Sequence, residues 1–139
     1  MEATKLPLAS IFTGHRVFDI PFYQRSYVWK KEQWERFLED MEFVSLESKD
    51  YFLGSAILKQ QNLNMGVTAD YRTVIDGQQR FTTIVIFCKA LCLKTGELDE
   101  FDRYFMVRNK KEGTKKCALV HSMNDRKDFE QVVSLTEDC

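Results

Sequence analysis

The stretch VIDGQQRFTT, residues 74–83, decides how this chain is interpreted. An apolar run ends at the carboxylate of Asp76, Gly77 follows, and two amides, an arginine and two hydroxyls precede a second apolar run. This order predicts a strand, a tight turn in which Gly77 supplies backbone freedom, and then a helix. The first N–H groups of a helix bind anions, phosphate above all. The segment DGQQR, residues 76–80, is therefore a candidate phosphate site.

The side chains of this segment suit nucleotide chemistry. Arg80 carries a planar, permanently charged fork that matches a phosphate. Asp76 is a candidate ligand of Mg²⁺, and it is equally suited to orient a water. The amides of Gln78 and Gln79 donate and accept hydrogen bonds, which suits a sugar, a base edge or a water. We take Asp76, Gln79 and Arg80 as candidate catalytic residues. The residues expected to bind the nucleotide here are Gly77, Gln78 and Thr82.

A purely structural interpretation of the same segment stays open. Asp-Gly before a helix is common turn chemistry. In that case Arg80 would form an ion pair with Glu39 or Asp40.

A second polar cluster lies upstream, in IPFYQRSYVW, residues 20–29. It too is predicted to be a strand, a loop and the approach to a helix. Arg25 is a candidate for a second phosphate, and Gln24 is assigned to the same site. The aromatic residues that would stack on a base are Tyr23, Tyr27 and Trp29. Trp29 is better explained as a residue that fixes the following helix to the core.

Hydrophobic periodicity predicts the other elements. Helices are expected over residues 5–13, 30–44, 79–94 and 125–133, and strands over residues 16–20, 51–59, 71–76, 104–108 and 117–121. Gly54 is expected to make a kink or bulge in its strand, and Gly96 to end the third helix. Residues 97–102 form an acidic patch, and the basic loop 109–116 joins the last two strands. Ser122 or Asn124 would cap the last helix.

Composition limits the class of protein. The 139 residues are 44% hydrophobic and 29% charged, which suits one globular domain over residues 1–139. The net charge of −1 gives the chain no overall attraction to nucleic acid or to an anionic membrane. No apolar run reaches the roughly 18 residues of a membrane span. The N-terminus lacks a secretory layout, so we expect a cytoplasmic protein with reduced cysteines. The tail has no stop signal, and we expect a fragment of a longer protein.

The chain resembles a known family. IPFYQRSYVW, LEDM, YFLGSAIL and VIDGQQRFTT occur in the order seen in the N-terminal domain of GmrSD-type restriction proteins. The stretch NDRKDF at residues 124–129 is similar to the family's Asp-Arg-x-x-Phe ending. The resemblance covers roughly residues 5–135. It implies a ParB/sulfiredoxin-like fold, a small mixed α/β domain of the α+β class with helices packed on a mixed sheet.

The resemblance also implies a function. The DGQQR and YQR segments are linked to binding and hydrolysis of a nucleoside triphosphate, which serves cleavage of modified foreign DNA. In the family, a companion nuclease domain or subunit with a His-Asn-His type site cuts the DNA. This chain has no such cluster, because its two histidines, His15 and His121, are isolated and both are expected to be structural. Sulfiredoxin has Cys and His where this chain has Gln78 and Gln79, so its thiol chemistry is excluded here.

Two other functions stay open. The first is a nucleic-acid-binding module without catalysis, in which the basic residues of the loop contact a DNA backbone; they are Arg108, Lys110, Lys111, Lys115 and Lys116. The second is an assembly module that binds no nucleotide.

Overall fold

The sheet is built around the strand that leads into the DGQQR segment. The computed structural model describes residues 5–12, 16–21, 28–47, 50, 52–61, 70–108, 113, 115–121 and 123–136. Its four-stranded sheet has the order β2-β3-β1-β6, with β1 at Arg16–Asp19, β2 at Ile57–Gln60, β3 at Asp70–Asp76 and β6 at Leu119–Val120. Strand β1 is parallel to both β3 and β6, and β2 is antiparallel to β3. This mixed sheet with its helices confirms the α+β class, while the ParB/sulfiredoxin-like assignment stays a prediction.

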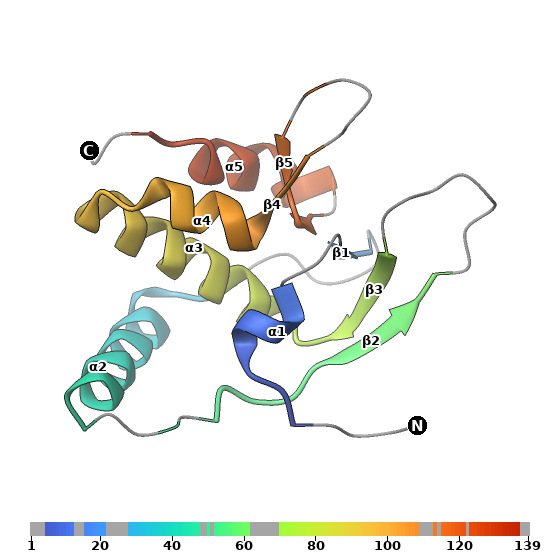
Figure 1. Cartoon of the computed structure of the whole chain (residues 1–139). Coiled ribbons are helices and arrows are strands. Elements are labelled where there is room, and N and C mark those ends of the chain that lie inside the picture. The colour runs from blue at the N-terminus through green and yellow to red at the C-terminus, as the bar shows by residue number, and fades with distance from the viewer. Residues whose placement is uncertain are drawn as a thin grey trace.

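Five helices complete the described part of the chain: α1 (Leu8–Phe12), α2 (Lys31–Glu47), α3 (Gln78–Thr95), α4 (Leu98–Phe105) and α5 (Met123–Val133). Helices α3 and α4 lie side by side, with α2 and α5 on opposite sides of the pair (Figure 1). Gly96 ends α3 as predicted, with φ at 73° and its N–H bound to the Cys92 carbonyl. Within the described residues, no helix has the length and apolarity to cross a membrane.

The core is an aromatic cluster between α1, α3, α4 and the sheet. The ring of Phe12 packs against Phe18, Phe81 and Phe105, with centroids 5.2, 5.5 and 4.9 Å away. Edge-to-face pairs of this kind add about 0.5–1.5 kcal/mol each beyond the area that they bury. Phe81 lies one residue beyond the DGQQR segment, so the start of α3 is anchored in the hydrophobic core.

Strand polarity places the site. Because β1, β3 and β6 are parallel, their carboxyl ends meet at one edge of the sheet, where ligands bind in many α/β proteins. Asp76 ends β3 at this edge and α3 starts two residues later.

Helix α2 is more peripheral than its apolar periodicity predicts. None of its residues is buried, and its outer apolar side chains are exposed. Its start is fixed by a cap that the sequence did not reveal, in which the Gln33 side chain accepts from the Lys30 N–H at 2.7 Å. A glutamine at the third helical position reaches back in this way in a capping box.

The strand predicted over residues 51–59 is wrong in its first half. Residues 52–56 form no strand, and β2 occupies only Ile57–Gln60. Gly54 has φ at 121°, which takes the chain away from β3. The backbone of this segment, residues 52–56, instead passes the start of α3.

The acidic patch proved to be part of a helix. Asp99 and Glu100 lie in the first turn of α4, where carboxylates are stabilised by the helix dipole. Phe101 and Phe105 follow four residues apart and are both buried. The strand predicted over residues 104–108 therefore shortens to β4 (Met106–Arg108).

The strand predicted over residues 117–121 is two strands in two sheets. Strand β5 (Lys115–Cys117) pairs antiparallel with β4 in the expected hairpin, and β6 joins the main sheet. Ala118 makes the transfer, because its N–H binds the Phe105 carbonyl and its carbonyl accepts from Phe18 N, both at 2.7 Å. Helix α5 starts at Met123, so Asn124 lies inside it, and Ser122 lies outside the described residues.

Candidate functional site

The DGQQR segment folds as predicted, from strand to turn to helix. Asp76 ends β3 with its side chain exposed, and Gly77 has φ at 105° and ψ at 8° immediately before α3. A Cβ at Gly77 would lie 3.0 Å from the Cβ of Ala56 and 3.3 Å from its Cα. The turn therefore needs glycine twice, for its left-handed backbone and for the close approach of residues 52–56.

Arg80 is held against the backbone of the same segment. Its Nη1 donates to the Ser55 carbonyl at 2.8 Å. A Cβ at Gly54 would lie only 2.5 Å from its Nε and 2.8 Å from its Cδ. Arg80 is nonetheless exposed, so one edge of its guanidinium is positioned by protein while the side chain still meets solvent.

Gln79 connects the two halves of the predicted site. Its Oε1 accepts from the Val28 N–H at 3.0 Å, across 51 positions of the chain. Val28 belongs to the upstream stretch IPFYQRSYVW. Tyr23, Gln24 and Arg25 of that stretch lie outside the described residues. The Gln79 contact nevertheless brings the chain that follows them to the first turn of α3.

The hydroxyls of the segment face inward. Thr82 is 2% exposed, and its Oγ1 donates to the Gln78 carbonyl at 2.7 Å while lying 2.9 Å from His121 Nε2. Thr83 is fully buried and donates to the Gln79 carbonyl at 2.8 Å. Both hydroxyls therefore stabilise the first turn of α3 from within.

His121 supports this turn from the end of β6. Its ring lies 4.4 Å from the ring of Phe129, and the side chain is buried. Burial lowers the pKa of His121, and the nearby Asp125 acts in the opposite direction. Since the single Thr82 proton goes to the Gln78 carbonyl, Thr82 accepts from an Nε2–H of His121, which agrees with the structural role expected for this histidine.

A cavity of about 200 Å³ opens beside the first turns of α3. Its lining comes from the end of the IPFYQRSYVW stretch, from α2, from residues 52–56 and from α3. The lining residues are Trp29, Gln33, Arg36, Phe37, Asp40, Leu53, Arg80, Thr83 and Ile84. Trp29 packs edge-on against Trp34 and Phe37 of α2 at 6.1 and 6.0 Å, which supports the expectation that it anchors this helix. Asp40, one of the two proposed ion-pair partners of Arg80, faces the same cavity.

The sequence analysis missed the contribution of α2 to this cavity. Gln33, Arg36, Phe37 and Asp40 follow the i, i+3, i+4, i+7 rule of a single helix face. That spacing was visible in the sequence. It was overlooked because the face mixes charged and aromatic residues and so matches neither a core face nor a solvent face.

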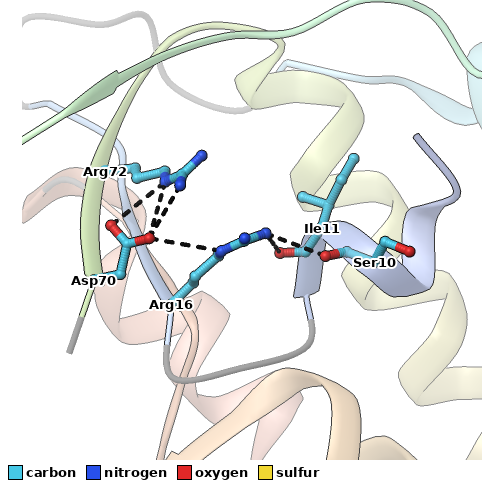
Figure 2. Close-up of polar contacts among 5 residues, drawn as sticks. All are labelled: Ser10, Ile11, Arg16, Asp70 and Arg72. Atoms are coloured by element: carbon cyan, nitrogen blue, oxygen red, sulfur yellow. Dashed lines mark hydrogen bonds and ion pairs between the residues drawn. The ribbon is translucent and has the colours of Figure 1, made fainter. Parts of the chain in front are cut away.

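A separate group of polar contacts, around Asp70, lies at the opposite edge of the sheet and links elements of the fold (Figure 2). Asp70 accepts from Arg72 at 3.0 Å and forms an ion pair with Arg16 at 3.6 Å. Arg16 also donates to the carbonyls of Ser10 and Ile11 at 3.1 and 3.4 Å. It therefore joins α1 to the starts of β1 and β3, away from the carboxyl edge that carries DGQQR.

Comparison with known proteins agrees with the motifs. No curated protein matches the chain. The family model described as "GmrSD restriction endonuclease, N-terminal domain" matches residues 8–138. The match spans nearly the whole chain and includes α3, the DGQQR turn, the cavity and α5. The chain therefore belongs to the family of GmrSD restriction endonuclease N-terminal domains.

Proposed function

We propose that this domain binds a nucleoside triphosphate with its phosphates at the start of α3, and that it hydrolyses the nucleotide in support of DNA restriction. One observation carries the proposal: Arg80 is fixed by Ser55 and Gly54 at the positive end of the α3 dipole, yet its side chain stays exposed. A guanidinium held in this way is ready for a bidentate phosphate contact and loses little freedom when the ligand arrives.

Asp76 is the residue that would hold Mg²⁺. Among the described residues, no three His, Cys, Asp or Glu side chains gather as a metal cluster. Proteins hold Mg²⁺ through one or two carboxylates while phosphates and waters complete its shell, so a single carboxylate such as Asp76 is sufficient. When bound, the ion would neutralise charge on the phosphates. Asp76 is exposed at the end of β3 and immediately precedes the turn.

The remaining residues take supporting roles. In this proposal Gln79 fixes the upstream chain to the turn through Val28, and its position beside Arg80 suits orientation of the attacking water. Gln78 and Gly77 contribute backbone at the turn. Thr82 acts through the Gln78 carbonyl, since its hydroxyl is buried. Tyr23, Gln24 and Arg25 are assigned to the nucleotide from the family's YQR motif.

Binding of nucleic acid at the basic hairpin β4–β5 has less support. Lys115 forms an ion pair with Asp102 at 3.0 Å. Lys116 lies 5.7 Å from the centre of the Tyr71 ring. Both contacts are with groups of the chain itself, which favours a stabilised hairpin; Lys110 and Lys111 lie outside the described residues. We therefore assign contact with DNA to the companion nuclease domain or subunit of the restriction system.

The test is thermal unfolding with ATP, GTP, CTP and UTP, each with Mg²⁺. A nucleotide at a hundred times its dissociation constant stabilises the native state by about 2.7 kcal/mol. Arg80→Ala should abolish that stabilisation. Arg103→Ala, which removes an exposed arginine from α4, should keep it. A folded wild-type chain that no nucleotide stabilises would refute the proposal. Release of phosphate, measured afterwards, tests hydrolysis separately.

A further inference from the structure

The cavity between α2 and α3 brings a second arginine to the proposed phosphate site. Arg36 reaches it from α2 and Arg80 from α3. Arg80 also belongs to the DGQQR turn, so the cavity and the turn share a wall.

The charge of the cavity follows from its polar lining. The Gln33 oxygen accepts from Lys30 N, and the Thr83 hydroxyl donates to the Gln79 carbonyl. The ionised groups are Arg36, Asp40 and Arg80. Two guanidinium groups and one carboxylate leave one positive charge. The remaining lining residues are apolar or aromatic: Trp29, Phe37, Leu53 and Ile84.

Packing determines how Arg36 faces the cavity. Phe37, the next residue of α2, lies edge-on to Phe87 of α3 at 5.3 Å and to Trp29 at 6.0 Å. These rings dock this face of α2 against α3. Arg36 lies beside that contact and is exposed. A ligand can therefore reach its guanidinium from solvent while the backbone that carries it is held in place.

We propose that Arg36 is a second phosphate-binding residue and that the cavity takes the terminal phosphates of the chain held at α3. This inference rests on the proposed function. A cavity of about 200 Å³ is smaller than the roughly 300–1,000 Å³ of pockets that enclose a whole ligand, so it takes one part of the nucleotide. Guanidinium groups from two walls select the part with the highest negative charge.

Asp40 allows a second test, because its negative charge should affect anion binding in the direction opposite to that of Arg36. It lies one turn after Arg36 on α2 and faces the same cavity. A carboxylate repels a phosphate, so its charge lowers the affinity for the anion. If the cavity instead held a base, Asp40 would accept from the base edge and its removal would weaken binding.

The experiment uses inorganic tripolyphosphate as the probe, without metal, so that only the phosphate chain is tested. Binding is followed by calorimetry and by the fluorescence of Trp29 in a Trp34→Phe background, because the chain has only these two tryptophans and Trp29 lines the cavity. Arg36→Ala should weaken binding roughly 10- to 100-fold, the usual effect of losing a charge-assisted hydrogen bond. Asp40→Asn should tighten it, and tripolyphosphate should change the Trp29 signal.

The matched control is Arg126→Ala. Arg126 is also an exposed helical arginine with an acid four residues later, Glu130, which it contacts at 3.2 Å. It lies on α5, on the opposite side of the α3–α4 pair from α2 (Figure 1). This variant should bind tripolyphosphate like the wild type.

Three results would overturn the inference. If nucleotides bind and Arg80→Ala abolishes that binding, but Arg36→Ala leaves tripolyphosphate affinity unchanged, Arg36 is not a phosphate ligand although the proposed function stands. If Asp40→Asn weakens the binding of a nucleotide that stabilises the wild type, the carboxylate contacts the base and the cavity is not a phosphate site. If the folded wild type binds neither nucleotide nor tripolyphosphate, the proposed function fails and this inference fails with it.

Discussion

The guanidinium of Arg80 lies directly against the backbone of Gly54, so close that a Cβ at position 54 would be 2.5 Å from its Nε. The two residues are 26 positions apart. A side chain at position 54 would therefore displace the guanidinium, and the φ of 121° independently favours glycine there. The backbone of residues 52–56 therefore positions the side chain of Arg80, the residue proposed to bind phosphate.

Gly54→Ala should separate this role from simple backbone strain. The new Cβ displaces the guanidinium, and we expect nucleotide affinity to fall about tenfold with the loss of one charge-assisted contact. Backbone strain adds a stability cost on the order of 1–3 kcal/mol. The control is Gly96→Ala, which has a left-handed φ of 73° but no atom within 4 Å of the new Cβ. It should lose stability and keep its affinity. Equal loss of affinity in both variants would contradict this positioning role.

Thr82→Val should destabilise the first turn of α3. It removes the hydroxyl that joins the Gln78 carbonyl to His121 Nε2, and a buried donor without a partner costs about 1–3 kcal/mol. Thr95→Val is the matched control, because Thr95 donates to the carbonyl four residues before it in the same helix but is exposed. Urea unfolding of both variants measures the difference. A cost for Thr82→Val no larger than that of the control would mean that the His121 contact contributes nothing.

Stability should fall as the medium becomes mildly acidic. Burial keeps the pKa of His121 below its ordinary value, so below about pH 6.5 the unfolded chain binds more protons than the folded one. The contribution of neutral His121 is fully present above that pH and is lost as pH falls through the lower folded pKa. His121→Gln keeps a donor toward Thr82 and removes the titration. Its free energy of unfolding should vary less than that of the wild type between pH 7.5 and 5.5, and identical slopes would contradict this assignment.

The half-buried Cys88 and the buried Cys117 should react slowly. Burial raises the pKa of both Cys88 and Cys117 to about 11, and the thiolate is the reactive form. Two pKa units lower the thiolate fraction about a hundredfold. In a Cys92→Ser, Cys139→Ser background, which leaves only Cys88 and Cys117, native protein at pH 8 should be modified by a thiol-specific disulfide reagent far more slowly than protein in urea. Rapid native labelling of Cys117 would show that α3, α4 and the sheet open readily.

Local chemistry explains what the sequence predicted well. The strand, turn and helix around Gly77 follow from one glycine between two apolar runs, and the end of α3 follows from Gly96. The chemical fit of Asp76 and Arg80 to a nucleotide was also visible in the sequence. Their roles remain proposals.

Long-range packing explains what was missed. Residues 52–56 have the composition of a strand, but their course is set by Arg80 and Ala56 against the start of α3. The acidic residues before Phe101 looked like a solvent-exposed loop in the sequence. They belong to a helix, because the Phe101 ring is buried, with the Nζ of Lys89 4.7 Å from its centre. Arg36 became a candidate only when α2 docked on α3. No local pattern encodes which helix face meets which.

The hairpin of β2 and β3 offers a place for reporters and fusions. Ile57 pairs with Asp76 beside the turn, whereas Gln60 pairs with Arg72 toward the other edge of the sheet. The connection between these strands therefore leaves the sheet away from DGQQR. A fluorophore, epitope tag or partner domain attached between Gln61 and Asp70 would start from strand ends that lie away from the proposed nucleotide site. Neither Gln61 nor Asp70 lines the cavity, which makes this connection the first choice for a biosensor or an immobilised form of the domain.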